Sequence, residues 1–579
     1  MSYQYIALVT GTGFAASAEQ RNKAASVLSH MGMTAHAFAP NTVVYVSGST
    51  PVLRLPSGGI VVGHVFSRIY APITHASQLP RIADATRLRR HFVQETWGDY
   101  VLFLASGPAS ISVTRDPSGA IDSLYCIEEG NGFVTSDITL ALRLGLYRRR
   151  IDWDYIAHRL TFPGLKTART GLAGVRELLP GNTLTIKPTH TSVDQDWSPW
   201  DFVASPRRHT GLEEAAAEVK TAVTGVVSAL ARTDCTILLE LSGGLDSSIV
   251  GMCLRGAGAR VFCSTIVTPV PGADERMYAG LIAERLGVNL EVCSLDLERS
   301  RFRFEPTAHF ATPRLGVLHH ANDEIMDAVA ARHDVSSLYS GAGGDSIFCY
   351  LPTAAPAVDA FKDRGLAGGL GSIKDLSDLH DCTYWKAGRL VLKKHLRGRR
   401  HRHRPDYRFL DPGTVAGAPE RHPWFDAPPG ALVGDNERIV GLTSTQLYRD
   451  SAARGKNRYL RFPLLSQPVM EACLAAPSWM WIAKGRNRAV ARRAFDDVLP
   501  PEVLNRRSKG TFRAFLGIYY ARNKHEILQY LVEGRLRSRG MLDVPALTRF
   551  TRDPLPSRDR DFSRVLDLCL VENWLRHQS

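Results

Sequence analysis

Residues 242–248 read Ser242-Gly243-Gly244-Leu245-Asp246-Ser247-Ser248, between an apolar stretch at 235–241 and a helical pattern at 247–255. A buried strand, a glycine turn and a helix in this order are typical of a parallel sheet covered by helices. The two glycines allow a sharp turn and leave backbone N–H groups free. Those groups lie at the positive end of the helix, so this first loop (242–248) is predicted to bind phosphate oxygens.

Asp246 adds a negative charge to this loop. A carboxylate alone would repel phosphate, so its presence indicates a bridging cation. Mg²⁺ suits the position, because one or two carboxylates together with phosphates commonly hold it. The loop has no Lys-Ser or Lys-Thr ending, so it is not the P-loop that transfers a γ-phosphate.

A second glycine turn that ends in a carboxylate follows a predicted strand at 335–339. This second loop (340–345) reads Ser340-Gly341-Ala342-Gly343-Gly344-Asp345. The carboxyl ends of parallel strands meet at one edge of a sheet, so we expect the two loops to lie side by side. Asp345 is then the second predicted Mg²⁺ ligand.

Two domains are predicted, at 1–205 and 206–579. Residues 1–205 contain short apolar stretches separated by Gly, Pro, Ser and Asn, which indicates an α+β domain with layered sheets. From about 210, strands alternate with helices of 10–15 residues, which indicates an α/β domain with a parallel sheet. After about 410 the pattern is mostly helical. Residues 189–208 are interpreted as the linker.

Composition narrows the class of protein. The chain has 579 residues, of which 44% are apolar and 22% charged, as in globular proteins. No run of about 20 apolar residues and no signal peptide is present, so no membrane association is expected. The nine cysteines form no Cys-x-x-Cys pair. We therefore predict reduced thiols in a cytoplasmic protein, without a zinc site.

The net charge of +14 is concentrated in residues 389–408, which hold nine Lys or Arg and one acid, Asp406. This basic run either attracts an anionic partner or forms a solvated face, and the sequence leaves both open. No helix-turn-helix, zinc-finger or aromatic RNA-binding motif accompanies it, so no nucleic-acid partner is predicted.

With these motifs the chain resembles the asparagine synthetase superfamily over most of its length. The first loop is similar to the pyrophosphate loop of enzymes that form adenylates, and the second to that family's Ser-Gly-x-Gly-x-Asp. The stretches 461–464, 499–500 and 507–510 resemble its later motifs. The resemblance implies ATP and Mg²⁺ as cofactors, with Asp246 and Asp345 as the metal ligands. The residues it places around ATP are Leu241, Ser242, Gly243, Gly244, Leu245, Asp246, Ser247, Ser248, Thr265, Ile266, Val267, Ser340, Gly341 and Gly343.

The first 205 residues resemble a glutamine amidotransferase domain of the N-terminal-nucleophile type, which implies a glutaminase-like αββα sandwich. Gly98-Asp99-Tyr100 and the stretch 115–119 carry this likeness. A glutaminase of this type needs a cysteine directly after the initiator methionine, but the chain has Ser2. The family's glutamine-binding Asn-Gly-Glu is also missing. We therefore expect a degenerate domain and an amine that comes from the acceptor.

Two branches of the family lack glutaminase in this way. β-Lactam synthetases carry a tyrosine where this chain has Ala342, and a lysine at the position that matches Arg488. The chain is more similar to the lasso-peptide macrolactam synthetases. That likeness implies adenylation of an Asp or Glu side chain of a ribosomal precursor peptide and closure onto its N-terminal amine, with a leader peptidase and a leader-binding protein as partners. Arg488 and Lys509 are the candidate catalytic residues for the oxyanion.

Three alternatives stay open at this point: an asparagine-synthetase-like ligase that uses ammonia, a β-lactam-synthetase-like cyclase of small molecules, and a non-catalytic scaffold. The presence of both Asp246 and Asp345 argues against the scaffold.

Overall fold

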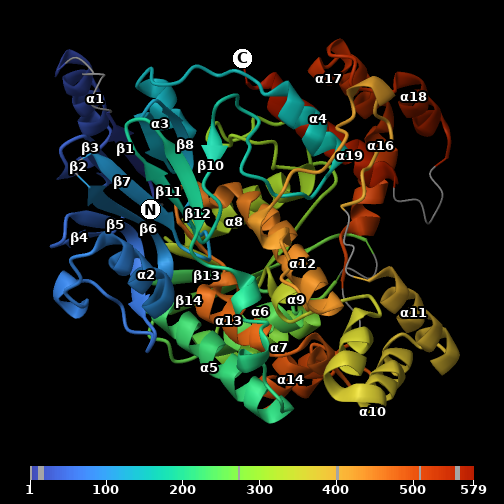
Figure 1. Cartoon of the computed structure of the whole chain (residues 1–579). Helices are drawn as coiled ribbons and strands as arrows, with labels where there is room; N and C mark the ends of the chain where they lie inside the picture. The colour runs from blue at the N-terminus through green and yellow to red at the C-terminus, as the bar shows by residue number, and fades with distance from the viewer. Residues whose placement is uncertain are drawn as a thin grey trace.

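The computed structural model describes residues 3–10, 18–107, 109–270, 274–398, 403–507, 510–554 and 561–578. Two antiparallel sheets fill the N-terminal region (Figure 1). The first has the order β10 (Arg176–Glu177), β8 (Leu124–Glu128), β9 (Asn131–Thr135), β1 (Tyr5–Val9), β3 (Thr42–Ser47) and β2 (Met33–Ala39). The second has the order β12 (Thr191–Gln195), β11 (Asn182–Ile186), β7 (Ser110–Arg115), β6 (Thr96–Gly107), β5 (Gly59–Ser67) and β4 (Val52–Leu55).

These two sheets pack face to face, and helices cover their outer surfaces. The helices of this region are α1 (Ala18–His30), α2 (Ala85–Glu95), α3 (Ile138–Arg143) and α4 (Trp153–Thr161). Val101 and Phe103 of β6 face the first sheet, whereas Leu102 faces α2. Successive strand residues point to opposite faces, so a strand covered on both sides is apolar at every position.

The predicted parallel sheet is confirmed. Its order is β15 (Leu290–Ser294), β14 (Arg260–Val267), β13 (Thr236–Glu240), β16 (Ser337–Ser340) and β17 (Tyr459–Arg461), and every pair is parallel. Helices α5 (Leu212–Ala231), α6 (Leu245–Leu254) and α7 (Arg276–Leu286) cover one face, and α8 (Val317–Arg332) covers the other. Strand β17 lies in the stretch expected to be mostly helical. This strand was not predicted because three residues, one of them a buried arginine, give no strand periodicity.

The remaining helices surround this sheet or extend from it. They are α9 (Gly344–Ile347), α10 (Ala355–Leu379), α11 (Tyr384–Arg397), α12 (Val433–Asp450), α13 (Gln467–Ala475), α14 (Ala489–Ala494), α15 (Pro501–Leu504), α16 (Arg513–Val532), α17 (Arg535–Ser538), α18 (Val544–Arg552) and α19 (Asp561–Arg576). Helices α10 and α11 lie together at one corner of the molecule (Figure 1). Part of the basic run therefore lies on α11, and residues 399–402 are outside the described residues.

The C-terminal helices pack against the N-terminal region. Leu160 of α4 shares a core with Leu568 and Trp574 of α19. The indole N–H of Trp574 donates to the backbone oxygen of Phe310 at 2.9 Å. Helix α4 of the N-terminal region and the C-terminal helix α19 thus share one hydrophobic core.

Two predictions from composition concern thiols and membrane helices. All nine cysteines are free, and five are buried, in agreement with thiols packed in the core. Within the described ranges, no helix combines the length and apolar composition that crossing a bilayer requires.

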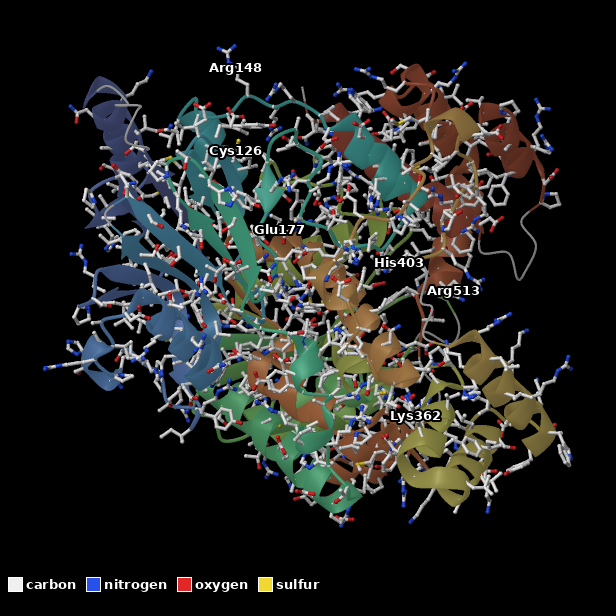
Figure 2. All side chains as sticks on the ribbon, viewed as in Figure 1. Cys126, Arg148, Glu177, Lys362, His403 and Arg513 are labelled. Atoms are coloured by element: carbon white, nitrogen blue, oxygen red, sulfur yellow. The ribbon has the colours of Figure 1, made fainter. Side chains whose placement is uncertain are left out.

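A buried ion cluster joins the N-terminal region to α12. Glu177 accepts hydrogen bonds from Arg115 at 2.9 Å, Lys166 at 2.6 Å and Arg314 at 2.7 Å. Lys166 also pairs with Asp450 of α12. Glu177 lies in the interior, between the N-terminal strands and α12 (Figure 2). Burial alone would raise the pKa of Glu177, but Lys166 and Arg314 hold it at about 2.

Acid should therefore weaken the fold through Glu177. Its folded pKa lies below its unfolded value, so its stabilisation is present above about pH 4.5 and is lost as the pH falls towards 2. The loss amounts to about 3 kcal/mol in the free energy of unfolding. Glu177→Gln should be less stable than the wild type at pH 7, and the difference should shrink in acid. Urea unfolding between pH 7 and 3 measures this, with the exposed Glu526→Gln as control. A gap that stays constant with pH would contradict the assignment.

Candidate active site

The first loop connects β13 to α6 at the carboxyl edge of the parallel sheet. Its serines bond to one another: the hydroxyls of Ser242 and Ser247 are 3.1 Å apart, and the Gly244 N–H donates to Ser242 at 3.3 Å. Gly243 has φ +70°, and a Cβ there would lie 2.9 Å from the backbone of helix α7. Only glycine fits this position, so the turn in the loop depends on it.

The second loop connects β16 to α9, and β16 pairs directly with β13. A Cβ on Gly341 would lie 2.4 Å from the Ser247 nitrogen, and one on Gly344 would lie 2.3 Å from Asp246 Cγ. The glycines therefore allow the two loops to touch. Ser340 accepts a hydrogen bond from the Ala342 N–H at 3.2 Å, which closes the turn. As a result Asp246 and Asp345 lie close to one another.

Arg488 joins the two carboxylates. Its Nη1 lies 3.0 and 3.2 Å from the oxygens of Asp246 and 3.3 Å from Asp345. Its guanidinium also lies 5.5 Å from the centre of the Tyr350 ring. The Arg488 backbone has φ +54°, an uncommon conformation for a residue with a side chain, directly before α14. The fold thus holds one cationic nitrogen between two acids that are distant in sequence.

A small cavity of about 70 Å³ opens beside the first loop at the end of β14. Leu241, Ser242, Thr265 and Ile266 line it. Val267, which was predicted with them, does not line this cavity, and its carbonyl accepts a hydrogen bond from the Leu295 N–H at 2.8 Å. Val267 is the last residue of β14 and pairs with Ser294 of β15.

Two residues that the sequence analysis did not select brace the first loop. Arg506 donates to the carbonyl of Gly243 at 3.2 Å and stacks on the Tyr278 ring at 4.1 Å. Glu275 pairs with Arg506 and accepts a hydrogen bond from the Gly510 N–H at 2.9 Å. No local pattern marks these residues, because they come together only through the tertiary fold.

Two predicted features lie outside the described residues: Lys509, the second candidate catalytic residue, and Ser2 at the N-terminus. The buried hydroxyl of Ser248 has no partner among the described residues.

The geometry fits a cation shared with phosphate. Two carboxylates already converge on one cationic nitrogen, as they would on a bound Mg²⁺. In the described part of the chain, no group of three or more His, Cys, Asp or Glu residues forms a metal site. Two carboxylates completed by phosphate oxygens are a common arrangement for Mg²⁺.

A parallel sheet with adjacent glycine loops and facing carboxylates defines an α/β nucleotide-binding enzyme. The family model described as asparagine synthase matches residues 218–576. The chain therefore belongs to the asparagine synthase family, and this domain is that of an ATP-dependent amide-bond ligase.

Two curated relatives match part of the chain. Amidase chyE of Penicillium rubens is 24% identical over 277 residues, which cover 44% of this chain and 40% of the relative. Amidase chry2 of Gibberella zeae is 22% identical over 281 residues, with the same shares. The chain thus spans about two fifths of the length of the curated relatives it matches.

Two solved structures are similar at a low level. The allosteric regulatory enzyme of purine biosynthesis has a TM-score of 0.23 and 9% identity, over 50% of this chain and 80% of that one. Glutamine phosphoribosylpyrophosphate amidotransferase from B. subtilis has a TM-score of 0.20 and 10% identity, over 50% and 65%. Similarity of this size says nothing about the reaction of this chain.

Proposed function

We propose that this protein is a lasso-peptide macrolactam synthetase. It would adenylate an Asp or Glu side chain of a precursor peptide and join it to the peptide's N-terminal amine, releasing AMP and pyrophosphate. The observation that carries the proposal is the pair of facing carboxylates, Asp246 and Asp345, on adjacent glycine loops. The sequence likeness to lasso cyclases, with Ala342 in the second loop, supports the choice of branch.

In the first half-reaction, the first loop and the end of β14 bind ATP. Asp246 and Asp345 would hold Mg²⁺, which would neutralise charge on the phosphates when bound. A carboxylate oxygen of the substrate forms a bond to the α-phosphorus, the bond from that phosphorus to the β-phosphate oxygen breaks, and pyrophosphate leaves. The backbone N–H groups at the start of α6 face the departing charge.

In the second half-reaction, the neutral N-terminal amine forms a bond to the acyl carbon, the bond from that carbon to the AMP oxygen breaks, AMP leaves, and the amine loses one proton to water. The free pKa of such an amine is near 8, so a useful fraction is unprotonated at neutral pH. The oxyanion that develops needs a positive donor, and Arg488 beside the loops is our candidate. Lys509 stays a prediction for the same role.

We further propose that residues 1–205 form a degenerate glutaminase-like domain of the αββα type, and that 206–579 form the synthetase domain. The packed antiparallel sheets with outer helices support this division. A leader peptidase and a leader-binding protein would supply the free core peptide.

Mass spectrometry of a reaction with Mg·ATP tests the proposal. The substrates would be peptides with an N-terminal glycine and an Asp or Glu at positions seven to nine, preferably from a precursor encoded beside this gene. We expect a product that has lost one water, together with AMP. Parallel reactions contain aspartate with ammonia or glutamine. Asparagine without peptide cyclisation would refute the macrolactam assignment in favour of the ammonia-dependent ligase.

A further inference from the structure

A second cavity, of about 140 Å³, lies near Arg488, since Tyr350 in its wall has its ring centre 5.5 Å from the Arg488 guanidinium. It is bounded by Tyr350 after the second loop, by the end of α10, and by the short hairpin of β18 (Ile482–Ala483) and β19 (Arg486–Asn487). Arg506, which bonds to the first loop, forms part of its wall. The cavity therefore borders the candidate active site.

The polar part of the cavity lining is strongly basic. Its described lining contains four arginines and no carboxylate; the arginines are Arg486, Arg492, Arg506 and Arg507. Arg492 donates to the backbone oxygens of Asn487 at 2.9 Å and Arg506 at 3.2 Å, and Arg486 donates to the side chain of Asn505 at 2.5 Å. These acceptors are neutral, so they satisfy the N–H groups without balancing the charge.

Neighbouring carboxylates compensate this charge only in part. Arg506 pairs with Glu275, but the described residues offer Arg486 and Arg492 no carboxylate partner. Asp375, near the hairpin, accepts a hydrogen bond from the Gly485 N–H at 3.3 Å and does not line the cavity. Burial, and then Arg488 and Arg486, lower the pKa of Arg492 to about 10. A bound anion would relieve this repulsion.

The lining also contains apolar residues: Tyr350, Leu351, Pro352, Leu379 and Ile482. A ligand that suits both kinds of lining has a short hydrocarbon body and a carboxylate. Inorganic pyrophosphate, in contrast, has no hydrocarbon part that could pack against the apolar residues. The volume suits one side chain rather than a whole peptide.

We propose that this cavity binds the acidic side chain that the enzyme activates, with the carboxylate towards Arg486, Arg492 and Arg507 and the methylene groups towards Tyr350 and Leu379. This assignment rests on the proposed function, and it deepens it by naming the residues that select an acidic side chain. Since Tyr350 of the cavity wall lies beside Arg488 and Arg506 bonds to the first loop, a carboxylate bound here would lie near the site of adenylation.

Binding of glutarate, without ATP or Mg²⁺, tests the assignment. Glutarate carries the carboxylate and methylenes of a glutamate side chain, and glutaramide is its neutral analogue. Affinity is measured by calorimetry at constant ionic strength, with pyrophosphate in a separate series. We expect glutarate to bind and glutaramide not to bind. Arg486 and Arg507 are exposed at the rim of the cavity. Arg486→Gln and Arg507→Gln should each lower the affinity for glutarate about 10-fold, because each removes a hydrogen bond between charged groups.

Arg493→Gln is the matched control. Arg493 follows Arg492 on α14, but it pairs with Glu213 and Asp496 on the outer surface. The Arg493→Gln variant should bind glutarate with the same affinity as the wild type. Failure of glutarate to bind the wild type would overturn the proposal, as would rim variants that weaken only pyrophosphate. Because no turnover is measured, a chain that binds glutarate but makes no macrolactam would refute the proposed function alone.

Discussion

Asp246→Asn is expected to lower the rate of AMP formation by on the order of 10²–10³-fold, while the protein stays folded. Asp246 is in the first turn of α6, and its carboxylate faces Asp345 and Arg488. The amide keeps the shape but removes one of two negative charges that would hold Mg²⁺ against the phosphates. The measurement is AMP release with the peptide substrate, over a range of Mg²⁺ concentrations.

Higher Mg²⁺ should partly restore the rate of Asp246→Asn, because the defect lies in cation binding. Circular dichroism verifies that the variant is folded. Asp497→Asn is the matched control, since Asp497 pairs with Lys220 on the surface at 2.6 Å. AMP formation by Asp246→Asn at the wild-type rate would place the reaction elsewhere in the molecule.

Arg461→Met should lower the free energy of unfolding by about 3–5 kcal/mol. Arg461 is fully buried on β17, where it contacts Asp234 at 2.9 Å and also Asp99 of β6. It therefore connects the parallel sheet to the N-terminal sheets. Its removal leaves two buried carboxylates without their shared cation. Urea denaturation at pH 7 measures the loss.

Two further variants separate the ion network from simple packing. Arg458→Met is the control, because Arg458 is nearer to solvent and pairs with Asp327 at 3.2 Å. The free energy of unfolding of this variant should fall by about 1 kcal/mol or less. Adding Asp234→Asn to Arg461→Met should recover part of the stability, since one unpaired charge is removed. Equal losses in Arg458→Met and Arg461→Met would show that burial of the network is unimportant.

The structure extends the sequence analysis most where residues far apart in the chain meet. The first loop was predictable, because strand, glycines and helix start are consecutive and their geometry is local. The adjacency of the second loop followed from parallel strands that end at one edge. The position of Val267 relative to the cavity, and the strand β17, were not predictable, because both depend on neighbouring strands.

Local sequence was enough to predict the parallel sheet, its two glycine loops and the acid in each loop, since hydrophobic periodicity and glycine conformations act over a few residues. The place of Arg488 between those acids, and the cavity lined by arginines near it, became apparent only from the three-dimensional structure. Arg488 is more than 100 residues from Asp246 and from Asp345, and the electrostatic forces between them depend on distance in space rather than in sequence. Packing, which no local pattern encodes, sets those distances.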